Sequence, residues 1–461
     1  MAKAIISQPR DFPAIEELLE ATALKEDLSA VPRPLAAQLV REVVAQNKAR
    51  LLAGRTSVTL DELYDEIRRT VATAAGDRMT RVINATGIIV HTNLGRAPLS
   101  RTLFEEVKDT VCGYSNVEFD LSSGGRGRRG GACERYLALL AGSESATIVN
   151  NCAAALFLIL NTLANRKAVL ISRGELVQIG GGFRIPDILK KSGAKLCEVG
   201  TTNVTTLADY EKNLNENTTL ILKVHKSNFI QAGFTEEVPL RNLTALGSAH
   251  DVLIVNDLGS GALTATEDQL GAAEPTVQQS VRDGADLTCF SGDKLLGGVQ
   301  AGLIVGRTKL IDGIKRNPLF RTFRVDKIAF AMLERVLASC LNGTHQHDVE
   351  LWRILSVPES ELYQRGKEMA HALGSPPELS VEATQAYVGG GALPEKGLPS
   401  AAIVFHKPFK ATALMQWFRS MRPPIIGRIE NERFMLDLKA VAIEDLPLVQ
   451  SSIKKVLEEG K

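Results

Sequence analysis

Short apolar runs alternate with helical stretches over the middle of the chain, and this alternation limits the fold more than any other feature. The runs "ATIVN", "AVLIS", "LILKV", "VLIVND" and "AGLIVG" are rich in Val, Ile and Leu. Short runs of this composition are typical of strands buried on both faces, and their alternation with helices predicts a mostly parallel sheet. The sequence therefore predicts an α/β fold, in which ligands bind at the carboxyl ends of the strands.

The sequence on either side of this region has a different pattern of apolar residues. A chain of 461 residues is also too long to fold around one hydrophobic core. The first part shows helical patterns only, including a capping box from Thr59 to Glu62. After the glycine-rich break "YVGGGALPEKGLPS", the last part mixes strand and helix patterns. We expect an N-terminal helical domain and linker over residues 1–80, a large α/β domain over 81–345 and a small α+β domain over 346–461.

Charge and cysteine content argue against several classes of protein. The formal net charge is +1, so binding to DNA through overall positive charge is not expected. Contact with RNA would need a local patch of basic residues. The six cysteines are scattered without metal-ligand spacing, which predicts a reducing compartment and no metal site. The longest apolar run, near "CAAALFLIL", is too short to span a bilayer, and the N-terminus lacks a signal segment. We therefore expect a cytoplasmic protein that does not contact membranes.

One local basic cluster occurs in the second expected helix. It contains Arg33, Arg41, Lys48, Arg50 and Arg55. From charge alone, a solvated helix face is the simpler interpretation.

Two charged residues follow strand patterns and stand out chemically. Lys294, in "FSGDKLLGGVQAG", comes just after the strand-like "ADLTCF", where a partly desolvated amine can attack a carbonyl. Gly297 and Gly298 leave room there for a flat cofactor ring. Asp257 ends the run "VLIVND", where a carboxylate can hold the protonated ring nitrogen of pyridoxal phosphate. Either residue alone is more typical of a surface loop or a turn, but the pair at two strand ends predicts a site.

A candidate phosphate cradle lies at the junction of a strand and a helix in "SATIVNNCAAALFL". Backbone N–H groups at a helix start bind phosphate, and small side chains let it approach. The residues at this junction are Asn151, Cys152 and Ala153. Ser260 and Ser291 can add hydroxyl donors, although a role as turn residues is equally compatible with the sequence.

The chain order of cradle, Asp257 and Lys294 resembles the aspartate-aminotransferase superfamily of pyridoxal phosphate enzymes, known as fold type I. The resemblance implies that Lys294 holds the cofactor as a Schiff base. It also implies that Asp257 keeps the ring an electron sink.

Longer segments are similar to the bacterial selenocysteine synthase family, and the similarity covers nearly the whole chain. They are "RVINATGIIVHTNLGRAPLS", "YSNVEFDLSSGGRGRR", "ISRGELVQIGGGFRIPDI", "FSGDKLLGGVQAG" and "NPLFRTFRVDK". One departure is Cys152, where the family leads us to expect asparagine. Backbone donors survive this change, so phosphate binding is still expected.

This resemblance implies a reaction and its partners. Serine carried by L-seryl-tRNA(Sec) would pass through a cofactor aldimine and an aminoacrylyl-tRNA intermediate, with Lys294 taking the Cα proton, and selenophosphate would then give L-selenocysteinyl-tRNA(Sec). The resemblance assigns selenophosphate binding to Arg96, Arg321 and Arg324, and the last two would share a helical face if their segment is helical. It also implies that the N-terminal domain reads the tRNA and that the protein is a homodecamer, a pentamer of dimers.

Two other readings remain open from the sequence. A pyridoxal phosphate lyase acting on a small amino acid or amino sugar acid would share Lys294 and Asp257 but would not need the helical N-terminal domain. A catalytically silent RNA-binding protein would need neither residue. Roles also stay open for a histidine that follows a strand and for three arginines that could contact tRNA or a neighbouring subunit: His225, Arg126, Arg128 and Arg129.

Overall fold

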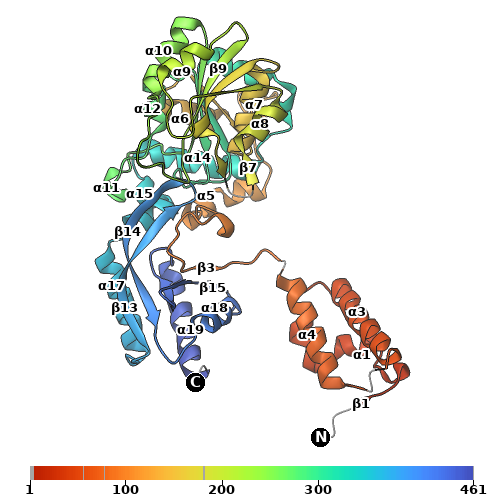
Figure 1. The fold of residues 1–461 in the computed structure, drawn as a ribbon. Coiled ribbons are helices and arrows are strands. Elements are labelled where there is room, and N and C mark those ends of the chain that lie inside the picture. Colours follow the sequence, from red (N-terminus) through yellow and green to blue (C-terminus); the bar gives the residue numbers. More distant parts are fainter. Residues whose placement is uncertain (1–4, 55–56, 77, 180–181, 460–461) are drawn as a thin grey trace. The chain divides into compact units, whose positions relative to one another are not determined.

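The computed structural model describes residues 5–54, 57–76, 78–179 and 182–459. The chain divides into two compact units, Met1–Arg81 and Val82–Lys461, each with its own hydrophobic core. Figure 1 draws both units in the colours of the sequence. None of the helices in the described ranges is both long and apolar enough to cross a membrane.

The first unit is helical, as its sequence pattern predicts. Its elements are β1 (Ile5–Ile6), α1 (Ile15–Glu20), α2 (Lys25–Leu28), α3 (Arg33–Leu52), β2 (Val58–Thr59) and α4 (Leu60–Gly76). The Thr59 N–H donates to Glu62 Oε2 at 2.8 Å, and the Glu62 N–H donates to Thr59 Oγ1 at 3.2 Å. This reciprocal pair is the predicted capping box, and it satisfies N–H groups that the start of α4 leaves without helical partners.

A seven-stranded sheet forms the centre of the second unit, in the order β4-β12-β11-β10-β9-β5-β8. The strands are β4 (Ser145–Val149), β5 (Ala168–Ser172), β8 (Lys195–Val199), β9 (Thr218–Val224), β10 (Leu253–Gly259), β11 (Leu287–Ser291) and β12 (Gly302–Gly306). β8, β5, β9, β10 and β11 are parallel, whereas β12 is antiparallel to both of its neighbours. β12 is antiparallel because only the loop 292–301 separates it from β11, and a parallel connection needs a crossover of a dozen residues or more. Because five of the seven strands pair in parallel and helices lie between them in the chain, the predicted α/β fold with a mostly parallel sheet is confirmed.

Helices cover both faces of this sheet (Figure 1). Side chains alternate along a strand, so Ile304 belongs to the core that includes residues of α7, α8 and α13, while its neighbours Leu303 and Val305 belong to the core that includes residues of α5, α6 and α14. The bounds of the main helices are α5 (Arg101–Cys112), α6 (Gly131–Ala141), α7 (Cys152–Leu163), α8 (Ile185–Ser192), α9 (Leu207–Asn213), α10 (Leu240–His250), α12 (Val277–Arg282), α13 (Thr308–Arg316) and α14 (Lys327–Asn342).

A four-stranded antiparallel sheet, ordered β13-β14-β17-β16, lies in the C-terminal part of the same unit. Its elements are α17 (Glu359–Ala372), β13 (Leu379–Gly389), β14 (Ala392–Phe405), α18 (Ala411–Arg419), β15 (Ile425–Ile426), β16 (Arg428–Glu430), β17 (Arg433–Asp437) and α19 (Leu446–Glu459). β3 (Ile83–Asn84) pairs in parallel with β15, so the start of the second unit joins the C-terminal core. The expected domain boundary near residue 345 stays a prediction.

Candidate active site

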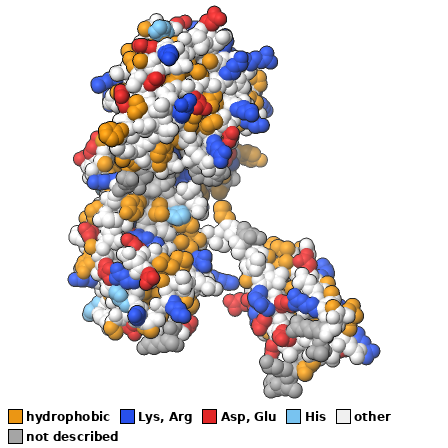
Figure 2. All heavy atoms as spheres, in the orientation of Figure 1, with side chains coloured by type: hydrophobic (Ala, Val, Ile, Leu, Met, Phe, Trp, Pro, Cys, Tyr) orange, Lys and Arg blue, Asp and Glu red, His pale blue; other side chains and the backbone are white. Residues whose placement is uncertain are grey.

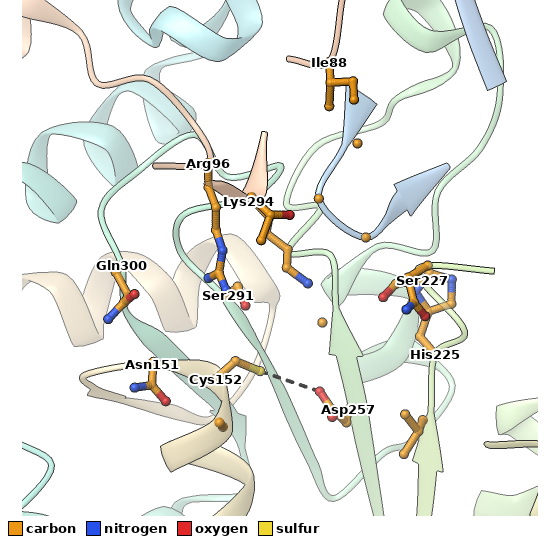
Figure 3. Close-up of a pocket in the computed structure, with 18 of the residues that line it drawn as sticks. Ile88, Arg96, Asn151, Cys152, His225, Ser227, Asp257, Ser291, Lys294 and Gln300 are labelled. Atoms are coloured by element: carbon orange, nitrogen blue, oxygen red, sulfur yellow. Dashed lines mark hydrogen bonds between the residues drawn. The ribbon is translucent and has the colours of Figure 1, made fainter. Parts of the chain in front are cut away.

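A cavity of about 740 Å³ opens at the carboxyl ends of the parallel strands, which is the predicted place for a ligand. Figure 3 shows side chains from distant parts of the chain pointing into it. Predicted site residues that line the cavity are Arg96, Asn151, Cys152, Ala153, Asp257, Ser291 and Lys294, and His225, whose role the sequence left open, lines it too. The volume is in the range of small-molecule and cofactor sites.

Lys294 lies in the loop that connects β11 to β12, and only 7% of it is exposed. The loop is tight, since the Gly297 N–H donates to the Lys294 carbonyl at 2.8 Å and the Gly298 N–H to the Gly292 carbonyl at 2.9 Å. Each bond fixes the backbone beside the lysine. This geometry places the amine at the cavity with little freedom for the main chain.

The role expected for Gly297 and Gly298 is not the one the structure gives them. A Cβ on Gly297 would lie 2.5 Å from Val349 Cγ1, and one on Gly298 would lie 3.2 Å from the Gly292 carbonyl oxygen. These glycines therefore permit close packing behind the loop. Of the described glycines, the nearest to the lysine amine is Gly391, at the turn between β13 and β14, where a Cβ would lie 3.1 Å from Lys294 Nζ.

Asp257, near the end of β10, is almost completely buried. Burial raises its pKa to about 6, while the Lys294 amine and hydrogen bonds from the thiols of Cys152 and Cys289 act in the opposite direction. The two Sγ atoms lie 3.6 Å and 3.7 Å from Asp257 Oδ1. A buried carboxylate beside an amine is typical of a functional site, because its charge is costly without a partner.

The β4–α7 junction has the form expected of a phosphate cradle. Asn151 caps α7, and its Oδ1 accepts a hydrogen bond from the Ala154 N–H at 2.8 Å. Cys152 and Ala153 follow at the cavity wall, and the first N–H groups of a helix have no acceptor within the helix. Ser291 lines the cavity from β11. Ser260 is fully buried and does not reach the lining.

The three arginines expected at one anion site lie in different places. Arg96 lines the cavity, and its Nη1 donates to Asp293 Oδ2 at 2.8 Å. Arg321 ends the short 3-10 helix Pro318–Arg321, so it does not share a helical face with Arg324. Arg324 pairs with Glu118, and neither Arg321 nor Arg324 lines the cavity of this single chain.

The residues with open roles also have defined surroundings. His225 follows β9, lines the cavity, and has its Nδ1 3.2 Å from the Leu258 carbonyl. Burial lowers the pKa of His225, which favours the neutral imidazole. The three arginines of the glycine-rich loop bind acids of their own chain: Arg126 and Arg129 bind Glu118, and Arg128 binds Glu134.

Sequence reasoning missed several lining residues, and all of them except Gln300 come from segments far from Lys294 in the chain. They are Ile88, Thr92, Ser227, Asn228, Gln300, Tyr387, Gly389, Gly390 and Gly391. The triple glycine of "YVGGG" was visible as a break, and positive φ angles at all three residues explain why glycine occurs there. Nothing local indicated that this turn reaches the lysine.

The donor set of the cavity fits pyridoxal phosphate. Lys294 would supply an amine for its aldehyde, Asp257 a carboxylate for its ring nitrogen, and the start of α7 with Ser291 donors for its phosphate. The fold and the site together place the protein among the pyridoxal phosphate-dependent enzymes of fold type I.

Comparison with known proteins identifies the family. A model of the L-seryl-tRNA selenium transferase family matches residues 82–442. The L-seryl-tRNA(Sec) selenium transferase of Aquifex aeolicus is 40% identical over 452 residues, covering 97% of this chain and 98% of its own. That of Nitratidesulfovibrio vulgaris is 39% identical over 462 residues, with the same coverage. The chain belongs to the L-seryl-tRNA selenium transferase family.

A solved structure supports the fold independently. D-Glucosaminate-6-phosphate ammonia-lyase superposes with a TM-score of 0.59 at 17% identity, covering 84% of this chain and 98% of its own. At this identity the likeness is one of fold.

Proposed function

We propose that this protein converts L-seryl-tRNA(Sec) to L-selenocysteinyl-tRNA(Sec), with selenophosphate as the selenium donor. Family membership supports the reaction class, and relatives of that name match the helical N-terminal unit as well as the α/β unit. The observation that carries the choice of substrate is the charge distribution of the cavity.

The cavity favours an esterified amino acid over a free one. Proteins commonly bind a free carboxylate through the paired N–H groups of arginine. Among the lining residues that the structure describes, the only arginine is Arg96, and it already binds Asp293. The turn that faces Lys294 adds Tyr387 and glycines, which carry no positive charge. An aminoacyl ester has no carboxylate charge, so it fits the part of the site that this chain supplies, where the arginine is already paired.

The residues of the chain divide the chemistry between them. Pyridoxal phosphate, when bound, supplies a ring that withdraws electrons from the serine Cα. Asp257 holds the ring nitrogen in its protonated form, and Lys294 Nζ accepts the Cα proton. Serine thereby loses water, made from this proton and the β-hydroxyl, and gains a carbon–carbon double bond. The selenium of selenophosphate adds to Cβ, a proton returns to Cα, and hydrolysis of the selenium–phosphorus bond releases phosphate.

The direct test is incubation of the purified protein with seryl-tRNA(Sec) and selenophosphate, followed by mass spectrometry of the amino acid released from the tRNA. Selenocysteine is expected from seryl-tRNA(Sec), but not from free serine or from bulk seryl-tRNA(Ser). Turnover of free serine at a comparable rate would instead favour the small-molecule lyase.

Arg96, Arg321 and Arg324 are proposed to bind selenophosphate. Alanine at any of them is expected to spare the loss of water from seryl-tRNA(Sec) but to slow selenium transfer about tenfold or more, because a charge-assisted hydrogen bond contributes about 1.5–3 kcal/mol. Single-turnover assays of the two half-reactions measure this. Arg335, an arginine of α14 that pairs with Glu106 at 3.6 Å, offers a control variant. Equal loss in both half-reactions would make these arginines structural.

Arg321 and Arg324 lie outside the cavity of one chain, so we propose that they serve the site of a neighbouring copy. Exposed apolar side chains near Glu118, which binds Arg324, fit a subunit interface: Tyr114, Phe119 and Leu121. A homo-oligomer, proposed to be a decamer, would bring these arginines to a second cavity. Mixing Arg324→Ala chains, which should transfer selenium slowly, with inactive Lys294→Ala chains is expected to raise selenium transfer above that of either variant alone, whereas a site built within one chain would not be rescued.

The helical unit is proposed to bind the tRNA. A chain that begins at Met79 keeps β3 and every proposed cofactor ligand, so it is expected to fold and to bind pyridoxal phosphate normally. It should lose at least about tenfold in affinity for seryl-tRNA(Sec), because the unit that distinguishes this tRNA is absent. Filter binding measures the effect, with seryl-tRNA(Ser) as the control. Unchanged affinity would assign tRNA recognition to the α/β unit.

Recognition by shape suits the surface of this unit better than a strong basic patch. Arg33 pairs with Glu16 and Glu20, and Arg50 pairs with Glu66, while Arg55 lies outside the described residues. Figure 2 shows Lys and Arg mixed with Asp and Glu over the visible face. We therefore expect only a moderate fall in tRNA affinity as salt rises.

A further inference from the structure

Asp257 has two cysteine neighbours that the proposed reaction leaves without a role. Asp257 of β10 and Cys289 of β11 are partners in the parallel ladder, so their side chains project from the same face of the sheet. The face that holds Cys289 is covered by α7, which begins at Cys152. The two Sγ atoms and the carboxylate oxygen all lie within 4.8 Å of one another. Figure 3 shows the Cys152 contact with Asp257.

Both thiols use the same oxygen of the carboxylate. Cys152 Sγ lies 3.6 Å and Cys289 Sγ 3.7 Å from Asp257 Oδ1. Hydrogen bonding with Cys152 and burial raise the pKa of the Cys289 thiol well above its ordinary value, so the Cys289 thiol keeps its proton and can donate it. Two hydrogen bonds to one oxygen restrict rotation of the Asp257 carboxylate. Its second oxygen, Oδ2, then remains able to accept a hydrogen bond from a ligand in the cavity.

We propose that Cys152 and Cys289 are positioning residues that hold Asp257 through Oδ1, so that Oδ2 is presented to the ring nitrogen of pyridoxal phosphate. Cys152 is the residue that departs from the asparagine expected in this family. An asparagine amide is also a donor, so the hydrogen bond rather than the sulfur is the required feature. The inference rests on the pyridoxal phosphate class of the enzyme and not on its tRNA substrate.

The two thiols are expected to lower the pKa of Asp257. The groups that face Asp257 are the thiols of α7 and β11, the Lys294 amine, and His225, whose backbone N–H donates to the Asp257 carbonyl at 2.9 Å. Hydrogen bonds from the thiols favour the charged carboxylate and lower its pKa against the effect of burial. Removing either donor should raise the pKa of Asp257 above about 6, so that a smaller share is ionised near neutral pH.

Cofactor binding by the full-length protein tests this. Pyridoxal phosphate is titrated into cofactor-free protein between pH 5 and pH 9, with absorbance as the readout and without tRNA or selenophosphate. Cys289→Ala and Cys152→Ala are expected to weaken binding about three- to tenfold at pH 7. The pH at which affinity falls on acidification should also be about 0.5–1 unit higher in these variants than in the wild type. Cys289→Ser and Cys152→Asn, which keep a donor, should stay within about twofold of the wild type.

Two results would overturn the proposal. Equal weakening by the alanine variants and the donor-retaining variants at every pH would mean that the cysteines only fill space. Stoichiometric zinc in the purified protein, lost in Cys289→Ala, would mean that the three donors hold a metal ion. Because the readout is cofactor affinity, failure here is distinct from failure to transfer selenium.

Discussion

Replacing Lys294 with alanine is expected to abolish the visible absorbance of bound pyridoxal phosphate and to lower selenium transfer by at least about 10³-fold. The variant loses the amine that is proposed both to anchor the aldehyde and to move the Cα proton. Absorbance spectra and single-turnover assays with seryl-tRNA(Sec) measure the two losses separately.

Lys226 provides a matched control for this variant. It lies near the end of β9, its Nζ is 3.0 Å from Glu237, and it does not line the cavity. Lys226→Ala is expected to keep the absorbance and most of the activity. Borohydride reduction followed by peptide mapping should place the cofactor on Lys294 in the wild type. A cofactor that stays reducibly attached to Lys294→Ala would identify another lysine as the anchor.

Asp257→Asn is expected to have opposite effects on activity and on stability. Turnover should fall about 10²–10³-fold, because an amide cannot hold the ring nitrogen protonated. The cofactor-free variant should be more stable than the wild type at pH 8, because the free energy of unfolding no longer includes the cost of a buried charged carboxylate. A pKa of about 6 in the folded chain, against about 4 when unfolded, corresponds to about 2–3 kcal/mol.

The difference in the free energy of unfolding between Asp257→Asn and the wild type should depend on pH, and this dependence tests the explanation. Above about pH 6 the wild-type carboxylate is charged in both states and the full cost is present. As the pH falls below 6, the folded chain takes up a proton before the unfolded chain does, so the advantage of Asp257→Asn shrinks and disappears near pH 4. Denaturant unfolding of both cofactor-free proteins at pH 8 and pH 5 measures it. A constant difference at both pH values, or near-normal turnover, would contradict the proposed role.

Local sequence was sufficient for much of the fold. The Val-, Ile- and Leu-rich runs predicted the strands because a strand buried on both faces must be apolar along its whole length. Lys294 and Asp257 could be placed at one edge of the sheet because parallel strands end together. The longer quoted segments indicated which family the chain belongs to, and the comparisons with known proteins confirm that family. The Thr59–Glu62 capping box was equally readable, since it depends on residues three apart.

Contacts between distant segments were decided only by the tertiary structure. Cys289 lies against Asp257 because the register of β10 and β11 places them opposite each other, and register depends on packing over the whole sheet. Gly391 faces Lys294 because a hairpin of the C-terminal region reaches the cavity, and no local pattern encodes that approach. Arg324 could be named from the sequence, but its pairing with Glu118 could not. Sequence periodicity fixes which face of an element is buried, whereas the partners on that face depend on how the elements pack together.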